Sequence, residues 1–191
     1  MREDRSVPRP LVVSATRTEA AHLPTGLDLV VTGIGKTAAA TVLTRHLAGR
    51  DDLDDLVLVN LGTAGALHDG MAAESGLYEI GEVINHEISA DAIRALGFDP
   101  RERLRIGDAP TVLATGDMFV TDPVVRTRLA AQAQLVDMEG YAYAWVAQEF
   151  GLPIRMVKHV SDSADESAMA WVEVVDRSAR ILGEWAATHL G

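Results

Sequence analysis

Short apolar runs alternate along this chain with segments whose apolar residues are spaced as in a helix. The runs are apolar on both faces and are bounded by glycine, proline or acidic residues, which is typical of buried strands. The sequence predicts strands at residues 11–13, 28–32, 56–60, 111–115, 135–136 and 154–160, and one more at the end of segment 76–84.

Four segments between these runs have the apolar spacing and end signals of helices. Two of them, residues 37–47 and 138–150, end near Gly49 and Gly151. The predicted N-caps are Asp122, with Pro123 at the first position of helix 123–133, and Asp137 before helix 138–150. The residues expected on the buried faces are Ala142, Trp145, Val146 and Phe150 in that helix, and Val172, Val175, Ala179, Leu182 and Ala186 in a closing helix at 171–190.

Two segments give no such signal. Residues 61–67 are rich in glycine and alanine, so we expect a turn there, and residues 85–109 show no clean period, so we expect irregular structure.

Alternation of buried strands with helices predicts a single α/β domain, with a mixed, mostly parallel twisted central sheet flanked by helices. We expect this domain to span residues 11–191 and residues 1–10 to form a flexible tail. Ligands of such sheets bind at the carboxyl ends of the strands. The residues that follow the predicted strands there are Glu19, Gly33–Gly35, Asn60–Thr63, Thr115–Asp117 and Ser161–Asp162.

Composition argues against several classes of partner and of chemistry. The net charge of −11 argues against a nucleic-acid partner, because a polyanion would be repelled. The chain has no cysteine, which excludes disulfides and cysteine nucleophiles and fits a cytoplasmic location. No apolar run approaches the roughly 20 residues that span a bilayer, and the N-terminus lacks the apolar core of a signal peptide.

Four familiar motifs are absent or incomplete. Gly33-Ile34-Gly35-Lys36 lacks the third glycine of a dinucleotide fingerprint and the first glycine of a Walker loop, so a tight strand-to-helix turn is the better interpretation. The six histidines show no ligand spacing, so we expect no metal. Ser161-Asp162 lacks the elbow sequence of a serine hydrolase.

Several ordered motifs, however, resemble one enzyme family. They are Thr32-Gly-Ile-Gly-Lys36, Asn60-Leu-Gly-Thr-Ala-Gly65, Ile80-Gly-Glu-Val83, Thr115-Gly-Asp-Met-Phe119, Val136-Asp-Met-Glu-Gly140 and Val160-Ser-Asp-Ser-Ala-Asp165. This set resembles the purine nucleoside phosphorylase/nucleosidase superfamily, and within it the methylthioadenosine/S-adenosylhomocysteine nucleosidases of methionine salvage. The resemblance runs from about Leu11 to Leu190. It implies a cofactor-free N-glycosidase that acts on a purine nucleoside and forms a homodimer.

The resemblance also implies roles for individual residues. Asp162 matches the acid that protonates the purine at N7, a role for which its site should raise its pKa, and Ser161 would orient it. Glu139 matches the glutamate that accepts hydrogen bonds from both ribose hydroxyls, with Met138 packed under the sugar. Glu19 matches the glutamate that activates water.

The remaining matches concern the base and the far side of the sugar. Phe119 would stack on the base while the Val120 backbone reads its edge. Thr63 would lie near the water or phosphate pocket, and Lys158 stands close to the sugar where relatives usually carry arginine.

Structural interpretations stay open beside these roles. Asp162 could cap a helix, Glu19 could be an exposed acid at a helix start, and Phe119 could belong to the core.

The reaction type also stays open at the level of sequence. Water is favoured as nucleophile because a carboxylate at Glu19 would repel phosphate. The alternatives are a phosphate-dependent phosphorylase and a non-catalytic nucleoside-binding protein on the same fold. The chain is shorter than typical members of the family between Glu19 and Asp28, and residues 85–109 match poorly, which leaves the 5′ substituent of the substrate undefined.

Overall fold

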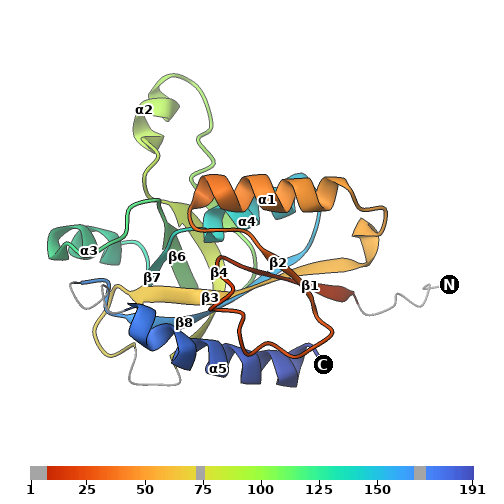
Figure 1. Ribbon diagram of the computed structural model, residues 1–191. Coiled ribbons are helices and arrows are strands. Elements are labelled where there is room, and N and C mark those ends of the chain that lie inside the picture. Colours follow the sequence, from red (N-terminus) through yellow and green to blue (C-terminus); the bar gives the residue numbers. More distant parts are fainter. Residues whose placement is uncertain (1–7, 72–75, 166–170) are drawn as a thin grey trace.

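The computed structural model describes residues 8–71, 76–165 and 171–191, and these form a central sheet covered by helices on both faces (Figure 1). In chain order the elements are β1 Arg9–Ser14, β2 Asp28–Val31, α1 Lys36–Ala48, a 3-10 turn Leu53–Asp55, β3 Leu56–Ala66, β4 Leu77–Asn85, α2 Ala90–Ala95, β5 Arg103–Arg105, β6 Thr111–Thr115, α3 Pro123–Ala130, β7 Leu135–Asp137, α4 Gly140–Glu149, β8 Ile154–Asp162 and α5 Trp171–His189. The predicted α/β class with a mixed sheet is confirmed.

The sheet closes on itself around β3, β8 and β4. Its strand order is β2-β1-β3-β7-β6-β4-β5, and β8 pairs with both β3 and β4. The pairs β1–β2, β1–β3, β3–β8, β4–β6 and β6–β7 are parallel, whereas β3–β7, β4–β5 and β4–β8 are antiparallel. Following the pairs from β3 through β8, β4, β6 and β7 leads back to β3. This ring brings the ends of strands from distant parts of the sequence to one place.

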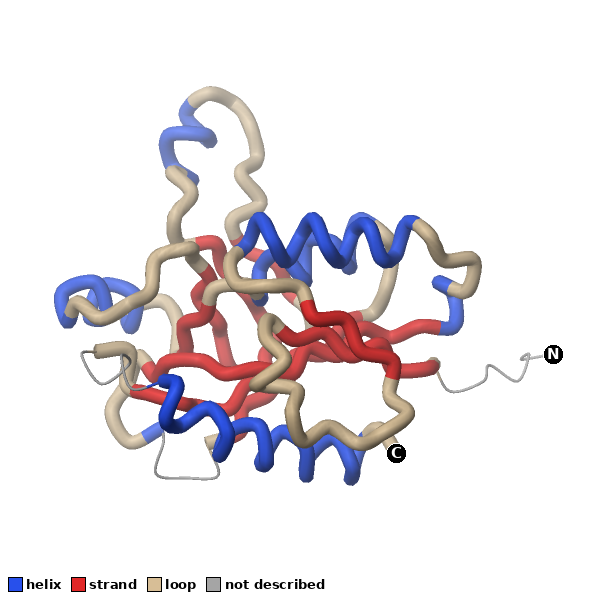
Figure 2. Tube along the Cα trace, viewed as in Figure 1, coloured by secondary structure: helices blue, strands red, loops and turns tan. Residues whose placement is uncertain are grey.

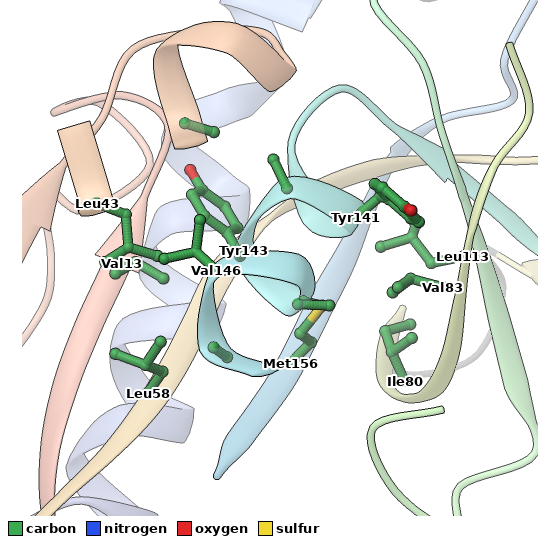
Figure 3. Close-up of a cluster of buried hydrophobic side chains, with 14 of the residues drawn as sticks. Val13, Leu43, Leu58, Ile80, Val83, Leu113, Tyr141, Tyr143, Val146 and Met156 are labelled. Carbon is green, nitrogen blue, oxygen red and sulfur yellow. The ribbon is translucent and has the colours of Figure 1, made fainter. Parts of the chain in front are cut away.

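Alternate residues of the strands pack against opposite helical layers, as the two-residue period of a strand requires. On one face, Val13 and Leu58 pack with Leu43 of α1 and Val146 of α4 (Figure 3). On the other face, Val59 and its neighbours pack with Leu182 and Ala186 of α5. Figure 2 shows the strands between these layers.

Helix α4 is enclosed on most of its sides. Of the four residues predicted on its buried face, Ala142 and Val146 are buried, whereas Trp145 and Phe150 are only partly buried. Tyr141, Tyr143, Ala144 and Ala147 are buried too. The prediction of a single buried face was therefore wrong, because α1 lies alongside α4 and covers what would otherwise be its solvent side (Figure 1). The buried Tyr143 hydroxyl is satisfied by Thr32 Oγ1 at 2.6 Å.

The segment 61–67, expected as a turn, instead continues β3 to Ala66. Its small residues serve close packing. A Cβ on Gly62 would lie 3.3 Å from both Glu19 Oε1 and Lys158 Nζ, and one on Gly65 would lie 2.8 Å from Asp162 Oδ1. Glycine allows the backbone to pass beside these charged groups, so its presence here reflects packing and not a turn.

The segment 85–109, expected to be irregular, contains α2 and β5. Both are short, and α2 has no buried residue, so neither produces an apolar period that could be recognised in the sequence. Residues 86–102 project from the body as an arm that carries α2 near its tip (Figures 1 and 2).

Element ends differ from the predictions by a few residues. Helix α3 ends at Ala130, α5 ends at His189, and β8 runs to Asp162 instead of stopping at Val160. In α5 the predicted buried residues Val175, Ala179, Leu182 and Ala186 are buried, and the Val172 side chain lies outside the described set. The tail was predicted at residues 1–10, but Arg9 and Pro10 belong to β1, because they pair with the start of β3. Residues 1–7 lie outside the described residues.

Two capping predictions can be compared with the structure. Asp122 caps α3, where its side chain accepts a hydrogen bond from Val124 N–H. Helix α4 starts at Gly140 and not at Met138, and Glu139 occupies the N-cap position. Asp137 still accepts the Gly140 N–H at 2.9 Å, although it stands three residues before that glycine.

Candidate active site

A pocket opens where the carboxyl ends of β1, β3, β7 and β8 meet the loop after β6. The space within it, together with the solvent at its open mouth, is about 730 Å³. Eight of the nine predicted site residues line it, namely Glu19, Thr63, Phe119, Val120, Met138, Glu139, Ser161 and Asp162. The sheet therefore brings residues from early and late parts of the sequence to one site, as expected for the carboxyl ends of parallel strands.

Glu19 is almost completely buried and is held by two threonines. Thr63 donates to Glu19 Oε1 from its backbone N–H and from its hydroxyl, both at 2.8 Å. Thr16 donates to Glu19 Oε2 from the same two groups, both at 3.1 Å. These four hydrogen bonds fix the carboxylate in one orientation at the pocket wall. The exposed helix-start acid considered for Glu19 is thus wrong, since the side chain is 5% exposed.

Thr16 also lines the pocket and was missed in the sequence. Its hydroxyl accepts the Glu19 N–H at 3.2 Å, while Glu19 reaches back to the Thr16 N–H. This reciprocal pattern is a capping box, whose sequence signature is Thr-x-x-Glu. The signature is present at positions 16–19, but here it closes a turn and no α-helix follows it.

Ser161 and Asp162 both face the pocket because β8 bulges between them. Consecutive residues of a regular strand point to opposite faces. The β3–β8 pairing, however, runs from Ala64 opposite Val160 directly to Gly65 opposite Asp162, which leaves Ser161 as an extra residue. Bulges of this kind re-aim side chains next to active sites.

Both oxygens of Asp162 have protein partners. Ser161 Oγ donates to Asp162 Oδ2 at 2.7 Å, and the Ala164 N–H donates to Oδ1 at 2.8 Å. Ala164 adopts a left-handed φ of 50°, a conformation uncommon for a residue with a Cβ, and this directs its N–H back at the carboxylate.

Glu139 is buried beside a second set of charged groups. It is 7% exposed, and its Oε1 accepts the Gly35 N–H at 2.8 Å. Burial, reinforced by the nearby Asp137 carboxylate, raises the pKa of Glu139 to about 8, against the smaller opposing effects of Lys158 and of the Gly35 hydrogen bond. The raised pKa favours the protonated form of Glu139 at neutral pH.

Lys158 is the one predicted residue that does not line the pocket. Its side chain is 2% exposed, and its ammonium lies behind the pocket wall, 2.9 Å from Asp137 Oδ2. Burial works against the charged form, but Asp137 and Glu139 outweigh it and raise the pKa of Lys158. Asp137, which also accepts the Thr115 hydroxyl at 2.6 Å, joins Lys158 to the start of α4.

The opposite wall of the pocket is apolar and open to solvent. Ile34, Met118 and Phe119 are 57%, 47% and 46% exposed, which is unusual for large apolar side chains that lie close together. Phe119 is thus not a core residue. Ile34 and Met118 were not predicted as site residues. Ile34 is a single apolar residue between two glycines, and Met118 only precedes the predicted residue Phe119 in the loop after β6.

Among the described residues no cluster of three or more histidine, aspartate or glutamate side chains could hold a metal ion. None of the helices in the described part of the chain is both long and apolar enough to cross a membrane.

The fold and the pocket define an α/β protein with a small-molecule site that contains several carboxylates. Comparison of the sequence with protein families identifies the class: the chain belongs to the phosphorylase superfamily, whose model matches residues 27–187.

Among curated relatives, the chain is 28% identical over 170 residues to the 5′-methylthioadenosine/S-adenosylhomocysteine nucleosidase of Shewanella halifaxensis, which covers 75% of this chain and 72% of the relative. It is also 28% identical over 142 residues to the aminodeoxyfutalosine nucleosidase of Helicobacter pylori, covering 62% of this chain and 61% of that one.

Among solved structures, the 5′-methylthioadenosine/S-adenosylhomocysteine nucleosidase of Helicobacter pylori with butyl-thio-DADMe-Immucillin-A has a TM-score of 0.79 at 21% identity, over 95% of this chain and 97% of that chain. A structure described as a futalosine hydrolase mutant of Helicobacter pylori also has a TM-score of 0.79, at 20% identity over 95% and 98% of the two chains. These likenesses establish the fold.

Proposed function

We propose that this protein is a purine nucleosidase, which hydrolyses the N-glycosidic bond of a nucleoside similar to 5′-methylthioadenosine or S-adenosylhomocysteine. The products are the free base and a ribose derivative. The observation that carries the proposal is the meeting of Glu19, Glu139 and Asp162 in one pocket with a largely apolar wall. The names of the sequence relatives support the same activity.

The reaction needs one group that donates a proton to the purine and a second group that accepts a proton from the attacking water. The C1′–N9 bond breaks through an oxocarbenium-like transition state. Asp162 gives its proton to N7, so that the purine leaves as a neutral molecule, and Ser161 orients the carboxyl group. Glu19 accepts a proton from water as the water oxygen bonds to C1′. Its position beside Thr63 suits this task.

The remaining groups hold the substrate. Glu139 accepts hydrogen bonds from the two ribose hydroxyls, and Met138 packs under the sugar. Phe119 stacks on the purine, and the Val120 backbone reads the edge of the base. Lys158 acts on the sugar through the buried pair that it forms with Asp137 behind Glu139.

Water is preferred to phosphate as the nucleophile. No arginine or lysine among the described residues lines the pocket, whereas phosphate binding calls for cationic side chains. The carboxylate of Glu19 would in addition repel a phosphate ion.

A panel of purine nucleosides, incubated with the protein with and without phosphate, tests this proposal with free base as the readout. We expect release of base at the same rate in both conditions. Strict dependence on phosphate would establish the alternative, a phosphorylase.

The second alternative is a non-catalytic nucleoside-binding protein on the same fold. The presence of both Glu19 and Asp162 in the pocket argues against it. We expect Asp162→Asn and Glu19→Ala to retain measurable nucleoside binding while losing turnover. Unchanged turnover in either variant would contradict the role assigned to that residue.

The 5′ substituent is the least defined part of the substrate, because the relatives above are named for different nucleosides, namely 5′-methylthioadenosine, S-adenosylhomocysteine and aminodeoxyfutalosine. The exposed side chains of Ile34 and Met118 at the pocket favour an apolar group such as methylthio. The same panel tests this, since an apolar 5′ group should lower KM relative to a 5′ hydroxyl.

We infer further that the protein works as a homodimer in the cytoplasm, where its activity would serve methionine salvage. Leu96 and Phe98 on the arm are 74% and 69% exposed, and a second copy is the partner that would cover them. The lack of cysteine is consistent with a reducing compartment.

A further inference from the structure

Residues that follow β4 make an unexpected connection to the pocket. Glu87 stands two residues beyond β4, at the base of the arm, and does not line the pocket. Its carboxylate nevertheless accepts hydrogen bonds from two consecutive backbone amides of the loop after β6, which carries Phe119. The distances are 2.9 Å from the Asp117 N–H and 3.0 Å from the Met118 N–H.

Glu87 is also bound to the first residue of α1. The Lys36 ammonium donates to Glu87 Oε2, and the two side chains are only 19% and 29% exposed. Burial opposes ionisation of Glu87, but the hydrogen bonds from Lys36 and from the two amides prevail and lower its pKa to about 2. Glu87 is therefore a carboxylate at neutral pH.

The same contacts extend to the ribose side of the pocket. Lys36 donates its backbone N–H to Asp117 Oδ1 at 2.7 Å, and the preceding N–H, that of Gly35, donates to Glu139 Oε1 at 2.8 Å. Gly35 has a φ of 91°, and a Cβ there would lie 3.1 Å from Asp117 Oδ1. The start of α1 thus joins the loop that carries Phe119 to the carboxylate expected to hold the ribose.

The loop fits closely against the base of the arm. A Cβ on Gly116 would lie 2.2 Å from His86 Nε2 and 2.9 Å from Glu87 Cδ. Only glycine allows the loop to reach the position in which Glu87 binds the next two amides.

We propose that Glu87 is a positioning residue of the active site, which through the amides of Asp117 and Met118 holds Phe119 where the purine must stack. This role rests on the nucleosidase function proposed above. It gives Glu87 no contact with the reacting atoms, so its loss should weaken substrate binding and leave the chemical step intact.

The test is Glu87→Gln, which keeps the size of the side chain and removes its charge. The amide NH₂ of glutamine cannot accept, so one of the two loop amides loses its partner. We expect KM for the nucleoside to rise about tenfold, as for loss of a charge-assisted hydrogen bond. We expect kcat to change by less than about twofold, because Glu19 and Asp162 are untouched.

Glu82→Gln is the matched control. Glu82 lies on β4 close to Glu87 in sequence, is 32% exposed, and pairs with Arg103 of β5 away from the pocket. We expect its KM and kcat to equal those of the wild type. Lys36→Gln removes one partner of Glu87 and keeps both amide contacts, so its KM should rise less than that of Glu87→Gln.

A readout that needs no substrate separates this role from the proposed function. In the protein without substrate, hydrogen exchange should become about tenfold faster in Glu87→Gln at whichever of the Asp117 and Met118 amides loses its acceptor. Exchange at both amides should stay unchanged in Glu82→Gln. Unchanged exchange together with unchanged KM would overturn the positioning role. A wild type that releases no base from any nucleoside would contradict the proposed function alone, since the exchange measurement would still decide the role of Glu87.

Discussion

Glu19 is held by matching pairs of donors from Thr16 and Thr63, each giving a backbone N–H and a hydroxyl. A water-activating carboxylate must be fixed to within a fraction of an ångström, because small displacements reduce the rate steeply. The two threonines provide that fixation from opposite sides.

We therefore expect Thr16→Val, which removes the hydroxyl at nearly constant shape, to lower kcat about tenfold with little change in KM. Thr18→Val is the control, because Thr18 lies exposed in the same turn and its side chain does not face the pocket. Steady-state kinetics of both variants check this, and a Thr16→Val enzyme with the kcat of the control would contradict it.

The role proposed for Glu139 would make substrate binding dependent on pH. Its pKa, raised to about 8, favours the protonated form at neutral pH, whereas the ribose diol of the proposed substrate would donate to the ionised form. Binding must then release a proton, so KM should fall as pH rises towards about 8 and level off above that value. Calorimetry in buffers of different ionisation enthalpy measures the proton directly, and a binding enthalpy independent of the buffer would exclude its release.

The same shift affects stability. Between the ordinary pKa of 4.5 and the folded value of about 8, the folded protein binds more protons at this site than the unfolded chain. The contribution of Glu139 to the free energy of unfolding therefore decreases as pH rises through that window. Glu139→Gln should lack this slope, so the difference in unfolding free energy between wild type and variant should change with pH across the window, which thermal unfolding at several pH values measures. Parallel stability curves would show that Glu139 is not the group responsible.

At the scale of elements, the bulge in β8 depends on the glycine opposite it. Gly65 leaves room for Asp162, since a Cβ there would lie 2.8 Å from Asp162 Oδ1. We expect Gly65→Ala to lower kcat more than about tenfold by displacing the acid. Gly107→Ala is the comparison, because its Cβ would meet nothing closer than 3.8 Å. Equal kcat values in the two variants would mean that the acid tolerates the displacement.

Prediction from sequence succeeded where residues carry their own signal. The apolar runs located the strands, and the ordered motifs located eight residues that share one pocket. It failed where the signal depends on a neighbour distant in sequence. Gly62 and Gly65 read as a turn because the charged groups that require them come from β8 and from the turn after β1. Helix α4 was assigned one buried face because its cover, α1, lies elsewhere in the chain.

The burial and the partners of charged side chains could not be predicted from the sequence either. Lys158 matched a sugar-binding position, yet its ammonium lies behind the pocket because Asp137 pairs with it there. Glu87 belonged to a segment with no recognisable pattern, and its importance emerges only from the loop that folds onto it.

At the scale of the whole molecule, the arm leaves apolar surface unpaired. A substitution of Phe98 by glutamate would place a charge in the proposed contact between two copies, where its desolvation is costly. We expect Phe98→Glu to be monomeric. The control is Asp91→Asn, on the exposed face of α2, which should keep the dimer mass expected of the wild type in solution. Light scattering coupled to gel filtration measures both masses, and a wild type already monomeric at micromolar concentration would rule out the dimer.

The order of pairing in the sheet has a consequence for how the protein is made. The last strand, β8, occupies the place between β3 and β4, so the ring of strands stays open until the C-terminal part of the chain arrives. On the ribosome the N-terminal strands emerge first and wait for this partner. Glu19 is synthesised early and Asp162 late, so a partly synthesised chain contains the residue proposed to activate water but not the proposed acid. Under the proposed function such a chain cannot cleave nucleosides, and activity begins only after β8 has paired with β3 and β4.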